Sequence, residues 1–418
     1  MKNVSLNEFF AEKANVCSND EQIIQSILRD VRERKDAALY EYNKRFDGYD
    51  GALRIENLLE KRESILTSDL LKAFEESGDA VRRFSERQME QCGDFQCELM
   101  PGVFTGQRVM PVQSAGVYVP AGRFPLISSV LMGIVPAVVA GVKRIVVCSP
   151  ASTEGINPSI AEVAFRAGAT EVYAVGGTQA IGAMAYGTET IAPVDVIVGP
   201  GNKYVAGAKK QVYGDVGIDF IAGPTEVCII ADSSANPVLV AADMLAQLEH
   251  DPDAQALLIT DSPELSVSVA RELKTQSEKM TNCIWLSESI ERNAISIVVS
   301  SMSDAPYVAD RIAPEHLSIQ TVDAKILAKE CSVYGSLFIG EYAAEVFGDY
   351  CAGINHTLPT QRSARYTGGL SVRQFLTFRT TLEMTQSGSS GLAKTAALLA
   401  EAEGLTAHMQ SAFLRKDT

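Results

Sequence analysis

From about residue 108 onward, short apolar runs alternate with helix-periodic segments, and this alternation constrains the fold more than any other feature of the chain. Runs such as Arg144–Ser149 and Glu226–Ala231 are rich in β-branched residues, which is typical of buried strands. Residues 158–167 and 263–277 carry apolar side chains three and four positions apart, as amphipathic helices do. Strands that alternate with helices indicate crossover units on a parallel sheet, so the sequence predicts an α/β protein.

The alternation occurs in two successive arrays, which predicts two related lobes with a cleft between them. The first array comprises strands 116–120, 144–149, 171–175 and 195–198 and helices 128–140, 158–167, 178–186 and 203–212. The second comprises strands 226–231, 255–260, 295–299, 317–320 and 336–339, a helix ending at 250, and helices 263–277, 303–312 and 323–330. Ligands of such sheets bind beyond the carboxyl ends of the strands. Residues 1 to about 98 are charged and helix-periodic, and we expect them to pack as a helical layer.

Charge and cysteine usage exclude several classes of protein. The chain has 37 basic and 52 acidic residues, a net charge of −15, which disfavours nucleic acid and anionic membrane surfaces as partners. No apolar run approaches the ~20 residues that span a bilayer, and the first residues lack the apolar core of a signal peptide. The eight cysteines include no Cys-x-x-Cys pair, so neither a disulfide framework nor a zinc ribbon is indicated. We therefore expect a cytoplasmic protein.

Two glycine-bearing turns in the first array could contact an anionic ligand. Val198–Asn202 and Gly176–Gln179 each join a strand to a helix, where backbone amides can approach a phosphate group. Neither turn matches the Gly-x-Gly-x-x-Gly fingerprint of dinucleotide-binding folds. Each turn therefore remains either a nucleotide contact or a tight turn that binds nothing.

The four histidines, of which none occurs before residue 250, carry more information. Gln247 and His250 lie one turn apart at the end of a predicted helix, where the pair could ligate a metal, hold a substrate or lie on the surface. Glu315 and His316 stand side by side ahead of a strand, as a general acid/base couple would. His356 lies in a glycine-bearing loop, residues 348–359, that also supplies Asp349, and His408 follows Glu403. Together, the donors compatible with zinc or another borderline divalent metal are Gln247, His250, Asp349 and His408. Their spacing does not establish that they meet.

Several sequence blocks together resemble the motifs of the histidinol dehydrogenase family, in the family's order and over nearly the whole chain. The blocks are Gly199–Asn202, Ala222–Glu226, Gln247–His250, Pro314–Leu317, Asp349 with Asn355–Pro359, and Glu403–His408. The resemblance implies two tandem Rossmann-like lobes with parallel-type sheets, as in aldehyde dehydrogenases, and helical N-terminal and C-terminal extensions. It also implies a Zn2+- and NAD-dependent enzyme that oxidises L-histidinol through L-histidinal to L-histidine, the last steps of histidine biosynthesis.

The resemblance further implies a role for individual residues. The metal ligands would be Gln247, His250, Asp349 and His408, and the catalytic pair Glu315 and His316. The NAD contacts would be Tyr118, Gln179 and Asn202. The substrate contacts would be Thr225, Gln247, His250, His316, Asp349, His356, Glu403 and His408.

A domain division and a homodimer follow from the same resemblance. Residues 1–13 would form an N-terminal extension, 14–117 and 225–370 the lobe with the zinc and catalytic residues, and 118–224 the NAD lobe. Residues 371–418 would form a dimerisation segment that reaches into the partner's site, so that Glu403 and His408 serve the other subunit.

Departures from the family pattern leave alternatives open. Ala121 stands where a second glycine is usual, Thr225 where serine is usual, and Gln361-Arg362 where small residues are common. Related enzymes oxidise other small polar alcohols, such as sulfonated diols, and an anionic substrate would need an arginine, for which the candidates are Arg123, Arg362 and Arg365. Retention of Glu403 favours a cationic amine instead. A metal-binding protein with a degenerate site is a third possibility, which the intact Glu315-His316 pair disfavours.

Overall fold

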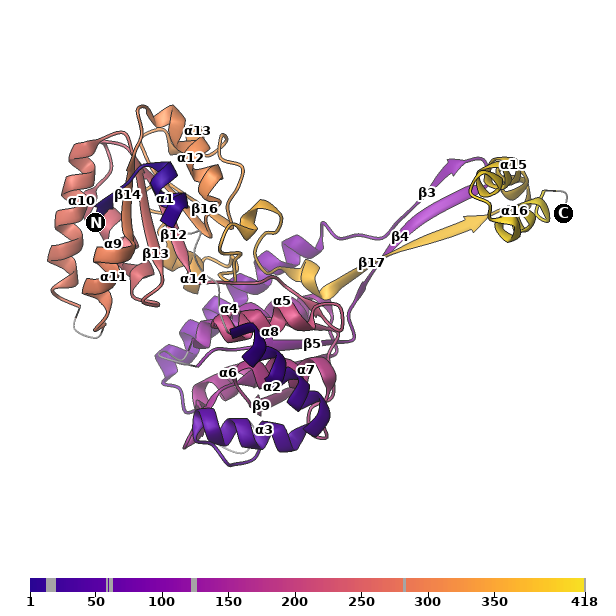
Figure 1. Ribbon diagram of the computed structural model, residues 1–418, viewed down its shortest axis with the longest axis horizontal. Helices are drawn as coiled ribbons and strands as arrows, with labels where there is room; N and C mark the ends of the chain where they lie inside the picture. Colours follow the sequence, from indigo (N-terminus) through magenta and orange to yellow (C-terminus); the bar gives the residue numbers. More distant parts are fainter. Residues whose placement is uncertain (13–19, 58, 60–62, 122–125, 281–282, 417–418) are drawn as a thin grey trace.

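The computed structural model describes residues 1–12, 20–57, 59, 63–121, 126–280 and 283–416. The chain forms two α/β lobes that lie side by side and a long arm that projects from them and ends in a helical pair (Figure 1). Two six-stranded sheets, one in each lobe, confirm the predicted α/β class and the predicted pair of lobes.

The first lobe is built on an entirely parallel sheet in the order β1-β14-β13-β12-β15-β16. Its strands are β1 (Lys2–Asn3), β14 (Ala294–Val298), β13 (Gln255–Thr260), β12 (Glu226–Ala231), β15 (His316–Gln320) and β16 (Ser336–Ile339). Alternate residues of a strand bury opposite faces: Cys228 and Ile230 belong to one core cluster, Val227 and Ile229 to the other. The strand order changes direction at β12: β13 and β14 follow on one side of it, and β15 and β16 follow on the other side.

The second lobe has the strand order β11-β10-β5-β6-β9-β2. Its strands are β11 (Gly217–Ile218), β10 (Val196–Val198), β5 (Ser114–Tyr118), β6 (Arg144–Ser149), β9 (Glu171–Ala174) and the antiparallel edge strand β2 (Arg54–Ile55). Here the strand order changes direction at β5, since β6 and β9 lie on one side of it and β10 and β11 on the other. The carboxyl ends of β5 and β10 are therefore the expected ligand site.

Helices cover both sheets, and their sequence signals explain where they begin and end. The helices of the first lobe are α1 (Leu6–Glu12), α9 (Pro237–Leu248), α10 (Pro263–Ser277), α11 (Leu286–Asn293), α12 (Ala305–Ile312), α13 (Ala324–Leu327) and α14 (Glu345–Tyr350). Those of the second lobe are α2 (Asp20–Arg34), α3 (Asp36–Tyr42), α4 (Ser68–Met89), α5 (Ile127–Ala140), α6 (Pro158–Ala167), α7 (Gly177–Tyr186) and α8 (Lys203–Val212). Asn157, Asn236 and Ser262 each accept a hydrogen bond from the first turn, directly ahead of a proline. No helix among the described residues is long and apolar enough to cross a membrane.

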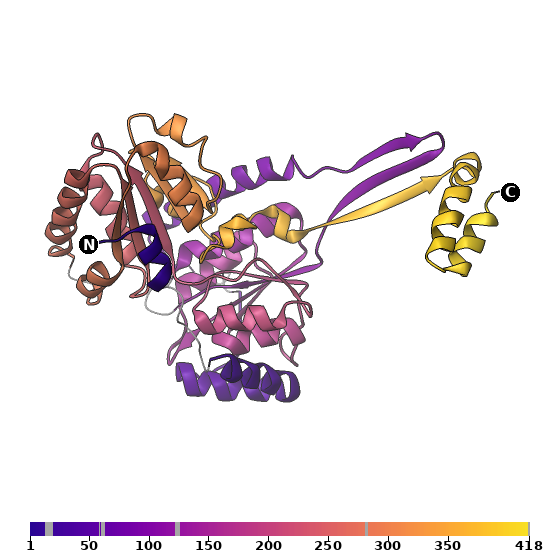
Figure 2. The ribbon, with the colours of Figure 1, turned by 45° about the horizontal axis from the view of Figure 1, so that its top comes forward.

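The arm is a three-stranded antiparallel sheet in the order β17-β4-β3. Its strands are β3 (Phe95–Met100), β4 (Val103–Pro111) and β17 (Leu376–Met384), and β17 leads into α15 (Gln386–Ala402) and α16 (Thr406–Phe413). Both views show the arm carrying α15 and α16 away from the two lobes (Figures 1 and 2). The predicted C-terminal extension is therefore a strand followed by two helices rather than helical throughout.

The predicted division between the lobes is wrong in two places within the described residues. Residues 20–55 and 114–117, which were predicted in the first lobe, belong to the second, because β2 and β5 pair within the second sheet and Ile24, Ile27 and Leu28 of α2 pack in the same core cluster as Tyr118. Residues 1–12 are no separate extension, since β1 pairs with β14 and Phe9 is buried in the first lobe. Sequence order does not reveal which sheet an edge strand joins, and a two-residue strand has no periodicity to detect.

Candidate functional site

One pocket of about 140 Å3 lies between the lobes and takes its lining from both of them. Pro200 and Gly201 reach it from the carboxyl end of β10, whereas Glu315 and His316 reach it from the start of β15. In the second lobe the pocket thus lies at the carboxyl edge of the sheet, as expected, but in the first lobe it lies at the amino edge. The reason is the direction of α9, which follows β12 and runs antiparallel to it. Its end, with Gln247 and His250, therefore lies at the edge of the sheet where the strands begin.

His316 lines this pocket and has one ring nitrogen without a hydrogen-bond partner among the described residues. Its Nδ1 lies 3.3 Å from the backbone oxygen of Glu226 and 3.4 Å from Oε1 of Glu345, two groups that accept a hydrogen bond, so the proton resides on Nδ1. Its Nε2 is buried and has no hydrogen-bond partner among the described residues. Burial lowers the pKa of His316 to about 3, which keeps the ring neutral. A neutral imidazole with an unpaired Nε2 is suited to accept a proton.

Glu315 lies beside His316 and is held in place at the end of the linker between the lobes, residues 219–225, which joins β11 to β12. Its Oε2 accepts hydrogen bonds from the Thr225 hydroxyl at 2.6 Å and from the Glu226 N–H at 3.0 Å. Burial nevertheless raises the pKa of this carboxyl well above its usual range. Thr225 therefore acts as an anchor for Glu315 through its hydroxyl, a role that its additional methyl group does not prevent.

Glu345 is a member of the site that sequence reasoning missed. It begins α14, is buried, and forms with His316 and Asp349 a group whose donor atoms lie within 4.8 Å of one another. Burial raises the pKa of Glu345, and it raises that of Asp349 to about 7. A signal was present in the sequence, because Glu345 precedes Asp349 by four positions and side chains at that spacing share one face of a helix.

Gln247 and His250 reach the same place from the end of α9. His250 lines the pocket, while Gln247 is fully buried behind it. The Gln247 amide contacts the Thr225 hydroxyl on one side and donates to the Glu345 carboxylate on the other, and its oxygen accepts from the Glu226 N–H at 3.1 Å. An amide oxygen has two lone pairs, so this one could accept from Glu226 and still ligate a metal.

His356 is fixed by two partners in the pocket wall. Its Nδ1 donates to the backbone oxygen of Asp349 at 2.8 Å, so its Nε2 accepts from the hydroxyl of Ser129 at 3.1 Å. Burial lowers the pKa of His356 to about 4. Ser129 is a further pocket residue that the sequence analysis did not single out.

The three predicted cofactor contacts lie together at the carboxyl edge of the second sheet. The Tyr118 hydroxyl accepts from the Gly177 N–H at 3.1 Å, which ties the end of β5 to the start of α7. Gln179 is buried in the first turn of that helix. Asn202 caps α8 by accepting from the amides of Tyr204 and Val205. Two helix N-termini thus converge where the strand order reverses, an arrangement suited to a phosphate-bearing ligand.

Two predicted site residues do not reach the pocket of their own chain. Glu403 ends α15 and His408 lies on α16, both exposed at the far end of the arm (Figure 2). Of the arginines of the anionic-substrate hypothesis, Arg362 and Arg365 do not line the pocket. Arg362 stacks over Phe10 at 5.1 Å and Arg365 is exposed, while Arg123 lies outside the described residues.

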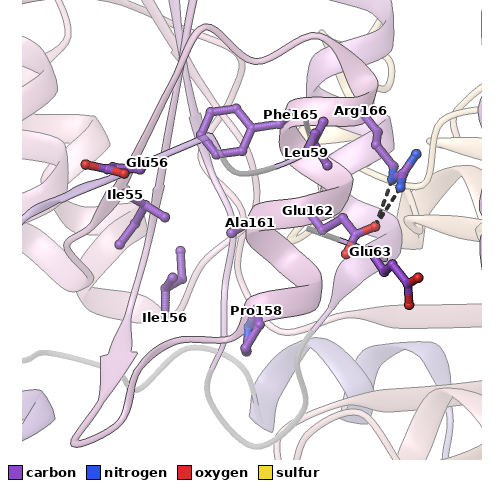
Figure 3. A pocket seen from close by; sticks show the side chains of 10 residues that line it. All are labelled: Ile55, Glu56, Leu59, Glu63, Ile156, Pro158, Ala161, Glu162, Phe165 and Arg166. Carbon is purple, nitrogen blue, oxygen red and sulfur yellow. Dashed lines mark hydrogen bonds and ion pairs between the residues drawn. The ribbon is translucent and has the colours of Figure 1, made fainter. Parts of the chain in front are cut away.

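A second cavity, of about 180 Å3, lies beside α6 and is drawn in Figure 3. Its prominent charged pair is Glu162 and Arg166, whose side chains meet along one turn of the helix (Figure 3). The Glu162 carboxylate also accepts from the Ser64 hydroxyl and the Ile65 N–H, so this carboxylate already has several partners. The pair stabilises the packing of residues 64–65 on α6.

Comparison with known proteins identifies the family. The family model described as Histidinol dehydrogenase matches residues 11–416. The chain belongs to the histidinol dehydrogenase family. It is 42% identical to histidinol dehydrogenase from a Synechococcus species, over 99% of this chain and 98% of that protein. It is 40% identical to the Zymomonas mobilis enzyme, over 94% of this chain and 92% of that protein.

A solved structure supports the same assignment for the fold. Histidinol dehydrogenase from Elizabethkingia anophelis superposes with a TM-score of 0.93 at 32% identity, over 99% of this chain and 98% of that one. The resemblance stated from the motifs is confirmed, and the chain is an oxidoreductase of the histidinol dehydrogenase family.

For this histidinol dehydrogenase homologue, we expect Glu345→Gln to lower kcat by about 10- to 100-fold, the usual cost of losing a partner that orients a site residue. In the native protein, Oε1 of the Glu345 carboxylate lies 3.4 Å from Nδ1 of His316, and the neutral amide of the variant removes that negative charge. Steady-state kinetics together with the bound-metal content would measure the effect. The matched control is Glu341→Gln, an exposed position four residues earlier, and an equal loss there would contradict the assignment.

Proposed function

We propose that the protein oxidises L-histidinol to L-histidine through L-histidinal, with two molecules of NAD and a bound Zn2+. The observation that carries this proposal is the His316 ring, neutral and with Nε2 unpaired, facing a pocket that joins a carboxylate cluster to the edge of the second sheet. Membership of the histidinol dehydrogenase family supplies the substrate.

In the first oxidation, His316 accepts the proton of the alcohol. The carbinol C–H bond breaks as its electron pair leaves as hydride for NAD, and the O–H proton passes to Nε2. The backbone oxygen of Glu226 holds the opposite nitrogen and so fixes the tautomer that can act as a base. Alcohol and NAD thereby become aldehyde, NADH and one proton.

The second oxidation requires water, because the aldehyde gains an oxygen atom. Glu315 is the adjacent carboxyl, and its raised pKa places it closer to the range in which it can accept a proton from water at the aldehyde carbon. A second NAD, when bound, would accept the hydride of the hydrate, which loses an O–H proton as well and becomes the carboxylic acid. Glu315 thus activates the water of the second oxidation, and His316 again accepts the O–H proton that the hydrate loses with its hydride.

The charge balance of the pocket favours a divalent cation. Glu315 and Glu345 are buried in the wall of this pocket with Asp349 beside them, and the described lining residues include no lysine or arginine. Buried carboxylates without a counterion are costly, and a dication would offset that cost. His250, Asp349 and Gln247 would hold the metal from this chain. When bound, Zn2+ would fix the imidazole and amine of the substrate so that the carbinol carbon faces NAD.

A second copy of the chain would complete the site. The arm exposes many apolar side chains that a monomer would leave in water: Phe95, Leu99, Met100, Met110, Phe378, Leu382, Leu398, Leu399, Phe413 and Leu414. Exposed apolar surface of this kind marks an interface. A homodimer in which residues 371–418 lie on the partner would bury it and would bring His408 and Glu403 to the partner's pocket as metal and substrate ligands.

The test is the absorbance of reduced nicotinamide with L-histidinol, NAD and zinc. We expect two NADH per histidinol, complete loss of activity after chelation, and recovery when zinc is added back. Turnover of a sulfonated diol but not histidinol would overturn the substrate assignment. Zinc binding without turnover of either alcohol would indicate a binding protein instead of an enzyme.

A further inference from the structure

A buried ion pair lies beneath the glycine turn of the second lobe and plays no part in the chemistry described above. Lys209 lies on α8, and Asp219 directly follows β11. Their side chains are 2% and 0% exposed and form an ion pair with each other. The Lys209 ammonium also lies 5.7 Å from the centre of the Phe220 ring.

The ion pair forms hydrogen bonds with both the backbone N–H and the backbone oxygen of Gly199. The Lys209 ammonium donates to the Gly199 oxygen at 2.9 Å, and the Gly199 N–H donates to Oδ2 of Asp219 at 2.8 Å. Gly199 has a φ of +115°, and a Cβ there would collide with the backbone of Tyr118. Backbone conformation and ion pair therefore hold this peptide in one place.

From Gly199 the chain leads directly to the cofactor edge and to the catalytic pocket. Pro200 and Gly201 line that pocket, and Asn202 caps α8. From Asp219 the chain leads into the linker between the lobes, which ends at Thr225, the residue that donates to Glu315. The ion pair thus fastens the start of the linker to the glycine turn.

The physical cost of this pair suggests a role other than stability. Two charges removed from water gain little net stability compared with apolar side chains of the same volume, while losing one partner leaves an uncompensated buried charge. An apolar pair could fill the space, but it could not hold both the N–H and the oxygen of Gly199.

We propose that Lys209 and Asp219 are positioning residues that set the glycine turn at the distance and orientation NAD requires from the catalytic pocket. The inference rests on the proposed use of NAD. Neither side chain touches the cofactor or the substrate; both act through Gly199. Their loss then weakens NAD binding while substrate and metal binding in the first lobe persist.

The decisive variant replaces both charges, Lys209→Met with Asp219→Leu, in the full-length protein loaded with zinc. Compared with Lys209→Met alone, the double variant has a higher thermal midpoint, because no unpaired charge remains buried; it stays below wild type, because the N–H and the oxygen of Gly199 lose their partners. Its KM for NAD stays raised by about tenfold or more, which corresponds to about 1.4 kcal/mol. Its KM for histidinol and its zinc content stay within about twofold of wild type, since the first lobe keeps its contacts.

Two further proteins make the result unambiguous. Lys210→Met is the matched control, because the neighbouring lysine is exposed and pairs with Glu21 at 3.2 Å, so NAD binding should not change. Asp219→Asn keeps the side-chain volume and serves if the double variant does not fold; we expect its KM for NAD to rise with an unchanged circular dichroism spectrum.

The outcomes separate this inference from the proposed function. A double variant or, where that does not fold, an Asp219→Asn variant with wild-type KM for NAD would show the pair to be structural and would overturn the inference. A fall in kcat with an unchanged KM for NAD would do the same. If the wild-type protein binds no NAD in a calorimetric titration, the proposed function itself fails, and the inference with it.

Discussion

Replacing His316 by alanine is expected to lower kcat for histidinol oxidation by roughly 10²- to 10⁴-fold, the range that a positioned general base contributes. The variant loses the unpaired Nε2 of the pocket wall, and the two other imidazoles that line the pocket have other roles: Nε2 of His356 is occupied by Ser129, and His250 is a proposed metal ligand. Steady-state kinetics with matched zinc loading would measure the loss.

Ser318→Ala is the control, because Ser318 lies two positions along the same strand and is also buried. Glu315→Ala separates the two oxidations: we expect aldehyde formation to be spared more than acid formation, since only the second step needs an activated water. Single-turnover measurements that find both half-reactions reduced equally would refute this division of labour between Glu315 and His316.

Mixing two inactive proteins, His316→Ala and His408→Asn, is expected to restore about a quarter of the wild-type activity after reassembly. Random pairing makes half of the dimers mixed, and each mixed dimer has one pocket in which both His316 and the partner's arm are intact. The arm carries His408 away from the pocket of its own chain, so only a shared site can produce this recovery (Figure 1).

The matched control mixes His316→Ala with His250→Ala. Both residues lie in the pocket of the same chain, so no mixed dimer has an intact site and no activity should return. Native mass spectrometry would establish that mixed dimers formed. If they form and the first mixture remains inactive, each chain completes its own site and the assignment of His408 to the partner is wrong.

Much of the fold was accessible from local patterns. The predicted strand 226–231 and helices 158–167, 203–212 and 263–277 coincide with the observed elements, because buried strands and capped amphipathic helices have strong local signals. The arm was missed, since β3 is exposed along its whole length and has no alternation of buried and exposed residues. β4 pairs with β17, which begins 265 residues after β4 ends (Pro111 to Leu376), so no local pattern links the two strands.

The site was accessible in part. Thr225, His250, Glu315, His316, Asp349 and His356 were named beforehand and line one pocket, whereas Glu345 was missed. The resemblance to a family named those residues by motif, and a motif omits residues that act from behind the pocket wall. Lys209 and Asp219 illustrate the same limit, because nothing in their local sequence indicates that they meet.

By itself, the sequence determined the α/β class, most strands and helices of the two sheets, the family and six residues of the pocket, because each of these depends on local periodicity or on short motifs. Only the tertiary structure decided which sheet each edge strand joins, that the pocket lies at the amino ends of β12 and β15, and that Glu345 faces His316. It alone separated His408 from its own pocket. These features depend on contacts between distant segments, and such contacts are fixed by packing and burial rather than by neighbouring residues.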